Sequence, residues 1–211
     1  TMNWILVSLL FFLVSLFACH NKSLHEEENL LQQKDLKLYI QMDSGGKSKR
    51  FPAVSMETLQ SVPLPSPDSL WITGEQSVSA GPPIRILMRS ENHPQQYWIV
   101  YMDATTKFPV SIDFRPAGTS RNQEIIIRYL FEPQTGELQE YNFQIVANHQ
   151  DWETVTHELL DNQIFVYDSR SLKKEKKADE KQKEIVRQQA YFIRDLFQKL
   201  LFYSVHSSTN A

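Results

Sequence analysis

Apolar and polar residues alternate along much of the middle of the chain. Leu36, Leu38, Ile40 and Met42 occupy every second position of residues 36–42, a period of two that is typical of a strand with one buried face. Segments of similar character recur at short intervals, with turn signals between them, at residues 70–73, 84–88, 97–102, 110–114, 124–131, 138–146 and 164–167. Because the intervals within residues 70–146 leave no room for intervening helices, the pattern predicts an antiparallel meander there, followed after a loop by the short strand at residues 164–167.

One face of this sheet is expected to be apolar and rich in aromatic residues. Ile125, Ile127 and Tyr129 share a face of one predicted strand, and Phe143 repeats the pattern on the next. Together with Trp98, they form the candidate face for a hydrophobic ligand or a partner. Such a face must be covered by another element. An unfilled cavity lined by these residues favours a ligand carrier, whereas a helix packed tightly over them favours a scaffold.

The predicted cover is a long amphipathic helix over residues 169–205. Its first part, residues 173–183, contains good helix formers with few apolar residues and is expected to be solvated. Its second part places apolar residues at steps of three and four, as in a buried helical stripe: Ile185, Val186, Ala190, Ile193, Leu196, Phe197, Leu200 and Leu201. Residues 206–211 are expected to be a disordered tail. The predicted fold class is therefore α+β, with a mainly antiparallel sheet (open sheet, sandwich or half-barrel) in residues 36–168.

Two local features interrupt the strand pattern. Residues 55–59 predict one helical turn, which must end by Val62 because a proline-rich run follows at residues 62–67. That run is expected to be an extended surface connection. Asp103 and Asp113 flank a predicted hairpin, and we interpret both as turn residues rather than as a pair of catalytic carboxylates.

An almost unbroken apolar run occupies residues 4–17 and leads to Cys19, the only cysteine of the chain. The run is shorter than the roughly twenty residues of a membrane-spanning helix, and its length is typical of a signal peptide. The sequence Leu16-Phe17-Ala18-Cys19 resembles the lipobox of bacterial lipoproteins. This resemblance implies that residues 1–18 are a signal peptide cleaved between Ala18 and Cys19. It also implies that Cys19 carries diacylglycerol and a further acyl chain such as palmitate.

The resemblance implies a location as well. A lipidated Cys19 anchors the chain to a membrane of the bacterial cell envelope. His20, at a position where Asp signals inner-membrane retention in many species, favours the outer membrane, facing the periplasm or the cell surface. Residues 19–35 then form a flexible tether with one or two helical turns at most. The alternative is an uncleaved signal anchor over residues 2–19, which also holds the remaining chain outside the cytoplasm.

Candidate chemistry is sparse. The densest group of titratable residues is His149, Asp151, Glu153, His157 and Glu158 in an expected loop, and it lacks the spacing of three or four converging metal ligands. The sequence contains no G-x-S-x-G, H-E-x-x-H or P-loop motif. We therefore expect no enzymatic activity, no metal and no cofactor.

Charge adds little to this picture. The formal net charge is −3 at pH 7, which gives no reason to expect nucleic acid as a partner. The lysines of residues 173–183 are interleaved with acidic residues, so a solvated helix face is favoured over a basic arm for anionic lipid.

The expected function is a non-catalytic binding, scaffold or assembly role in the cell envelope, with another envelope protein as partner. The first alternative is a periplasmic carrier of lipid or another hydrophobic ligand, because a helix-capped antiparallel sheet resembles the architecture of lipoprotein-sorting carriers. The second alternative is an envelope hydrolase, which requires ionisable groups that converge in a cleft.

Overall fold

The computed structural model describes residues 26–44, 47–70, 83–116, 123–147, 151–158, 163–168, 171–176 and 180–207. The chain divides into two compact units, Thr1–Gln33 and Lys34–Ala211. In the first unit, residues 26–31 form a short helix, and the amide of Gln32 donates to the carbonyl of Glu28 at 3.1 Å. This helix lies in the segment for which we predicted a tether with one or two helical turns.

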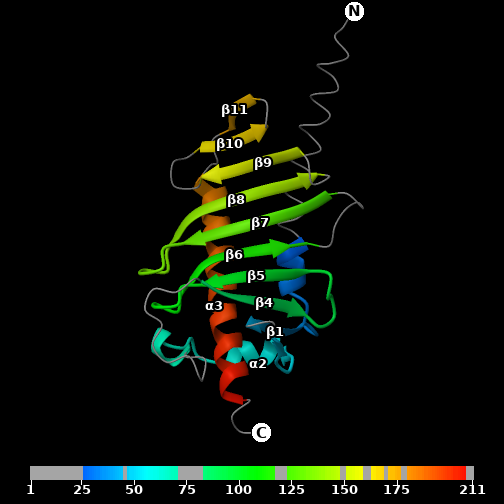
Figure 1. Cartoon of the computed structure of the whole chain (residues 1–211), viewed down its shortest axis with the longest axis vertical. Helices are drawn as coiled ribbons and strands as arrows, with labels where there is room; N and C mark the ends of the chain where they lie inside the picture. The colour runs from blue at the N-terminus through cyan, green and yellow to red at the C-terminus, as the bar shows by residue number, and fades with distance from the viewer. Residues whose placement is uncertain are drawn as a thin grey trace, which may run out of the picture. The chain divides into compact units, whose positions relative to one another are not determined.

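The second unit is built on one antiparallel sheet. Its eleven described strands are β1 (Lys37–Ser44), β2 (Lys47–Arg50), β3 (Val54–Ser55), β4 (Ile84–Ser90), β5 (Tyr97–Met102), β6 (Pro109–Arg115), β7 (Gln123–Phe131), β8 (Leu138–Ala147), β9 (Asp151–Glu158), β10 (Gln163–Asp168) and β11 (Ser171–Lys176). The order across the sheet is β11-β10-β9-β8-β7-β6-β5-β4-β1-β2, and β3 also pairs with β1 (Figure 1). From β4 to β11, neighbours in sequence are neighbours in the sheet, which confirms the predicted meander as an open sheet.

Three helical segments accompany the sheet in the described part of this unit. The helix α2 (Met56–Ser61) is capped by Ser55, whose hydroxyl accepts from the amide of Thr58 at 3.2 Å, and it ends before Val62, as predicted. A 3₁₀ helix, η1, spans Pro67–Leu70. The predicted strand at residues 70–73 is therefore wrong at Leu70, and residues 71–73 lie outside the described part. The long helix α3 spans Glu180–Ser207.

Two of the hairpin loops have the same backbone geometry. After β5, the amide of Asp103 donates to the carbonyl of Phe108, and the amide of Lys107 donates to the carbonyl of Asp103. After β7, the amide of Glu132 donates to the carbonyl of Glu137, and the amide of Gly136 donates to the carbonyl of Glu132. The fifth residue of each loop has a positive φ, 62° at Lys107 and 71° at Gly136. Both loops thus join their strands with the same tight geometry.

The core lies between one sheet face and α3, which packs against β1 and β8 and crosses the strands between them (Figure 1). Cross-strand pairing places Met88 beside Trp98, Trp98 beside Phe114 and Phe114 beside Ile127, so that one row of large apolar residues runs across four strands. The helix contributes a buried stripe made of Val186, Ala190, Ile193, Leu196, Phe197, Leu200 and Leu201. The predicted α+β class, with an open sheet and a C-terminal helix, is confirmed.

The C-terminal part differs from the prediction in three respects. Residues 171–176 form β11 instead of the start of the helix, and α3 continues through Ser207, beyond the predicted end at residue 205. Residues 206 and 207 are thus helical, and residues 208–211 lie outside the described part. Lys183, expected to be solvated, is 3% exposed and pairs with Glu180 at 2.5 Å, whereas Ile185, expected in the buried stripe, is 53% exposed.

Candidate functional site

The predicted hydrophobic face is brought together by the sheet and is covered. Trp98, Ile127 and Tyr129 have no exposed surface. The ring of Trp98 contacts Phe114 at a centroid distance of 5.1 Å, and the ring of Tyr129 contacts Tyr141 at 5.5 Å.

The other two predicted residues of this face are placed by backbone register alone. Phe143 pairs with Ile127, and Ile125 pairs with Ile145. The side chains of Ile125 and Phe143 lie outside the described part. The described residues of the face therefore belong to the packed core.

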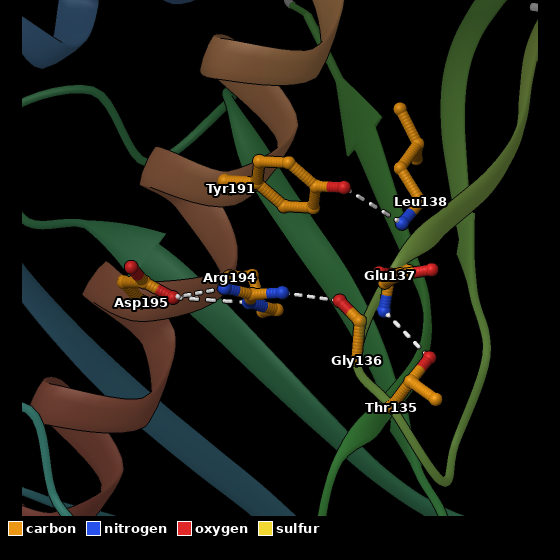
Figure 2. Close-up of polar contacts among 7 residues, drawn as sticks. All are labelled: Thr135, Gly136, Glu137, Leu138, Tyr191, Arg194 and Asp195. Atoms are coloured by element: carbon orange, nitrogen blue, oxygen red, sulfur yellow. Dashed lines mark hydrogen bonds and ion pairs between the residues drawn. The ribbon is translucent and has the colours of Figure 1, made fainter.

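A polar contact holds α3 against the loop between β7 and β8 (Figure 2). The amide of Leu138 donates to the hydroxyl of Tyr191 at 3.3 Å, and Arg194 donates through Nη1 to the carbonyl of Gly136. Asp195 in turn accepts from Nε of Arg194 at 3.0 Å, and the guanidinium lies 4.7 Å from the centre of the Tyr191 ring. Together these contacts fix the position of α3 along the sheet.

The geometry of Gly136 permits this contact. With φ at +71°, its backbone has a conformation that L side chains rarely adopt, and a Cβ there would lie 3.3 Å from Nη1 of Arg194. The groups involved are a guanidinium, a carboxylate that pairs with it, a phenol and two backbone groups. These groups join α3 to the β7–β8 loop, and we call the arrangement the clasp.

The opposite face of the sheet, which we call the outer face, carries a buried ion pair. Asp113, 1% exposed, accepts two hydrogen bonds from Arg128, at 2.7 Å from Nε and 2.6 Å from Nη2. The hydrogen bonds that Arg128 donates to Asp113 raise the pKa of Arg128, against the opposing effect of burial. Asp113 lies within β6, so our interpretation of it as a turn residue is wrong.

Asp103 is a turn residue, as predicted. Its carboxylate accepts from the amides of Thr105 at 2.8 Å and Thr106 at 2.7 Å. The hydrogen bond from the Thr106 amide is the main cause that lowers the pKa of Asp103. The two aspartates thus have separate hydrogen-bond partners.

The outer face also carries a row of alternating arginines and tyrosines, which the sequence analysis missed. The arginine–tyrosine ladder consists of Arg50, Tyr39, Arg89, Tyr97 and Arg115, from strands β2, β1, β4, β5 and β6. Cross-strand pairing aligns Tyr39 with Arg89, Arg89 with Tyr97, and Tyr97 with Arg115. The guanidinium of Arg50 lies 3.9 Å from the ring centre of Tyr39, and that of Arg89 lies 4.9 Å from Tyr97. All five residues occupy polar positions of their strands. This pattern was the only indication in the sequence that they could share the outer face.

The titratable group near residue 150 is in a different setting from the one predicted. Residues 151–158 form β9 rather than part of a loop, and His157 pairs with Tyr141 and with Ile164. Their side chains and His149 lie outside the described part. Among the described residues, no three His, Cys, Asp or Glu side chains are grouped as a metal site would require.

The predicted lipidation site, Cys19, and its cleavage partner Ala18 also lie outside the described part. Within the described ranges, no helix is both long enough and apolar enough to cross a membrane. No family model, no curated protein and no solved structure matches the chain.

Proposed function

We propose that this chain is a bacterial lipoprotein of the cell envelope, anchored through Cys19, whose globular unit has a non-catalytic scaffold or assembly role. The proposal for the anchor is supported by the apolar run and the Leu16-Phe17-Ala18-Cys19 sequence. In this proposal the outer membrane is the expected site, and an envelope protein is the expected partner.

One observation carries the choice of a scaffold over a carrier. A carrier requires a cavity between the sheet and its cover. Trp98, Ile127 and Tyr129, which were expected to line such a cavity, have no exposed surface. The facing residues Ile193, Phe197 and Leu200 of α3 are equally buried. Interiors packed in this way have little room for a ligand, so the helix serves as a fixed half of the core.

The anchor is tested by expression of the full chain in its native host beside the Cys19→Ser variant. We expect the unchanged chain to yield a membrane species that starts at Cys19 and carries acyl mass, and the variant to lose the acyl mass and the cleavage. A Ser23→Ala variant, changed just beyond the cleavage site, is the control and should be processed normally. If the unchanged chain and the Cys19→Ser variant both stay in the membrane at full length and without acyl mass, the leader is an uncleaved signal anchor and the lipoprotein proposal is wrong.

The scaffold role is tested on the same purified protein. Organic extraction followed by mass spectrometry should release no lipid in stoichiometric amount beyond the acyl chains bound to Cys19. One lipid molecule per chain that stays bound through purification and is not replaced by detergent would instead support the carrier. A scaffold also predicts an envelope protein that stays bound in stoichiometric amount through two successive purification steps, from both wild-type and Ser23→Ala membranes.

A further inference from the structure

The arginine–tyrosine ladder gives one end of the outer face a positive charge. Lys37, on the same face at the start of β1, is exposed, and its carbonyl accepts from the amide of Glu91. Glu91 pairs with Arg50 at 3.4 Å. In the described part of the chain, neither Lys37 nor Arg89 forms an ion pair. Two carboxylates lie near these cations: Glu91, which pairs with Arg50, and Asp43, whose pKa Arg89 helps to lower. Lys37, Arg50 and Arg89 thus leave this end of the face positive, in a chain whose net charge is −3.

The side chains of the ladder are held in place by stacking. Arg50, whose side chain is 55% exposed, lies over the buried ring of Tyr39. Arg89 lies over Tyr97, and its Nε has no hydrogen-bond acceptor among the described residues. A guanidinium stacked on a ring keeps its charge and its planar donor edge. Arg50 and Arg89 are thus cations held against tyrosine rings. Arg89 forms no ion pair among the described residues, although its charge contributes to the lowered pKa of Asp43 on the same face.

Phosphate is one of the anions that a planar guanidinium binds in a bidentate manner, and tyrosine is enriched where proteins meet lipid headgroups. The position of the ladder in the chain points to the same ligand. Lys37 follows Cys19 by 18 residues (37 − 19), and a chain of this length reaches at most about 60 Å when fully extended. In the sequence, the first strand after Cys19 that the structure describes is β1, the strand that carries Lys37 and Tyr39.

We propose that the ladder and Lys37 form a docking surface for the phosphate groups of the anionic membrane to which the chain is anchored. This proposal rests on the membrane attachment proposed above, and it holds for a lipid anchor and for an uncleaved leader alike. Each cation near an anionic surface strengthens binding about fivefold. Docking would orient the globular unit with its outer face toward the bilayer and α3 away from it.

The test uses the full chain purified from native membranes and reconstituted into vesicles of phosphatidylcholine, with or without phosphatidylglycerol. A short pulse of a water-soluble acetylating reagent is followed by mass spectrometry of each lysine, with Lys199 on α3 as the internal reference. We expect acetylation of Lys37 to slow about fivefold or more, relative to Lys199, in the vesicles with phosphatidylglycerol. High salt should remove this protection because it screens exposed charges.

Three variants isolate the ladder. Arg89→Gln should weaken the protection of Lys37 about fivefold, whereas Arg89→Lys, which keeps the charge, should retain most of it. Arg187→Gln removes one charge from α3 and should leave the protection unchanged. Thermal unfolding of each variant checks the fold. If Arg89→Gln does not fold, the proposal is still tested by the salt dependence of Lys37 protection in the unchanged chain and by the protection of Lys37 in Arg89→Lys.

Two results would overturn the proposal. One is an equal rate of Lys37 acetylation in both kinds of vesicle, or a protection that salt does not affect. The other is protection of Lys37 in native envelopes without protection in phosphatidylglycerol vesicles, which would assign the surface to an acidic protein partner instead. The intact mass of the same preparation reports whether Cys19 is lipidated, so a failure of the anchor proposal is distinguished from a failure of the docking proposal.

Discussion

Asp113 and Arg128 form a bidentate ion pair between adjacent strands, with N–O distances of 2.7 and 2.6 Å. The two residues pair directly in the register of β6 and β7. The carboxylate is almost completely buried, whereas the guanidinium side chain keeps 32% of its surface exposed. The pair therefore places an ionic contact in the centre of the outer face, where both hydrogen bonds of the carboxylate come from one partner.

Substitution of this carboxylate should be costly. Asp113→Asn leaves Arg128 without its anionic partner in a half-buried site, and we expect a loss of about 2 kcal/mol in the free energy of unfolding. Denaturant titration measures this loss. Arg85→Gln is the matched control, because Arg85 pairs with Asp43 at 3.6 Å on the same face with both side chains about 40% exposed, and it should cost under about 0.5 kcal/mol. Equal losses of unfolding free energy in the two variants would contradict our expectation that the buried Asp113–Arg128 pair stabilises the fold more than the exposed pair.

Gly136→Ala should destabilise the clasp between α3 and the β7–β8 loop. Its positive φ costs an L residue about 1 to 2 kcal/mol, and the new Cβ would meet Nη1 of Arg194 at 3.3 Å. The melting temperature should fall by roughly 2 to 8 °C for a domain of this size. Gln134→Ala, at an exposed position of the same loop, should change it by less than about 2 °C. A Gly136→Ala protein as stable as the Gln134→Ala protein would show that the loop relaxes without strain.

Asp103 should contribute to an acid-dependent part of the stability. Its pKa is lowered in the folded chain from the ordinary value of 3.8, mainly by the Thr106 amide. The unfolded chain therefore binds more protons as the pH falls, so the contribution is present above the unfolded pKa and is lost as the pH falls through the folded pKa. Asp103→Asn should flatten the dependence of unfolding free energy on pH below about pH 4. Because the pKa of Asp43 is also lowered, mainly by the hydrogen bond that its carboxylate accepts from the Ser48 side chain, part of the dependence should remain in the Asp103→Asn protein. An unchanged slope in that variant would contradict the role of Asp103.

The strands with regular alternation were predictable from the sequence. β1, β4, β5, β6, β7, β8 and β10 each place apolar residues at every second position over most of their length, and the predicted ranges agree with the observed ones within a few residues. The turn at Ser55 was predictable for a different reason, since its hydroxyl caps α2 and the prolines that follow exclude a longer helix.

β9 and β11 were not predicted, because they form through pairing with neighbouring strands and their own sequences do not alternate between apolar and polar residues. β9 is polar, and its β-branched residues Thr154, Val155 and Thr156 were the overlooked indication of a strand. The sequence of β11, Ser-Leu-Lys-Lys-Glu-Lys, has the composition of a helix, yet these residues pair with β10. Pairing with β10 overrides helix propensity, which amounts to a few tenths of a kcal/mol per residue.

The candidate site was also predictable only where it depends on residues of a single strand. The apolar face of Trp98, Ile127 and Tyr129 follows from periodicity, because a strand's own residues determine which of them share a face. The arginine–tyrosine ladder draws each member from a different strand, so it depends on the order and register of five strands. Neither quantity is encoded locally. The anchor at Cys19 stays a prediction from sequence.

The two edges of the sheet restrict how other chains can associate with it. In the described part, the sheet ends in β2, with the sequence Lys-Ser-Lys-Arg and all four residues exposed, and in β11, which contains three lysines. Lysines on an edge strand oppose the approach of another strand through charge repulsion and desolvation. The unpaired backbone groups at these edges are thus protected against strand addition and fibrillar association. A protein that assembles with this domain is expected to bind through a face of the sheet or through α3, and the domain should remain monomeric at concentrations where an unprotected sheet of this width would aggregate.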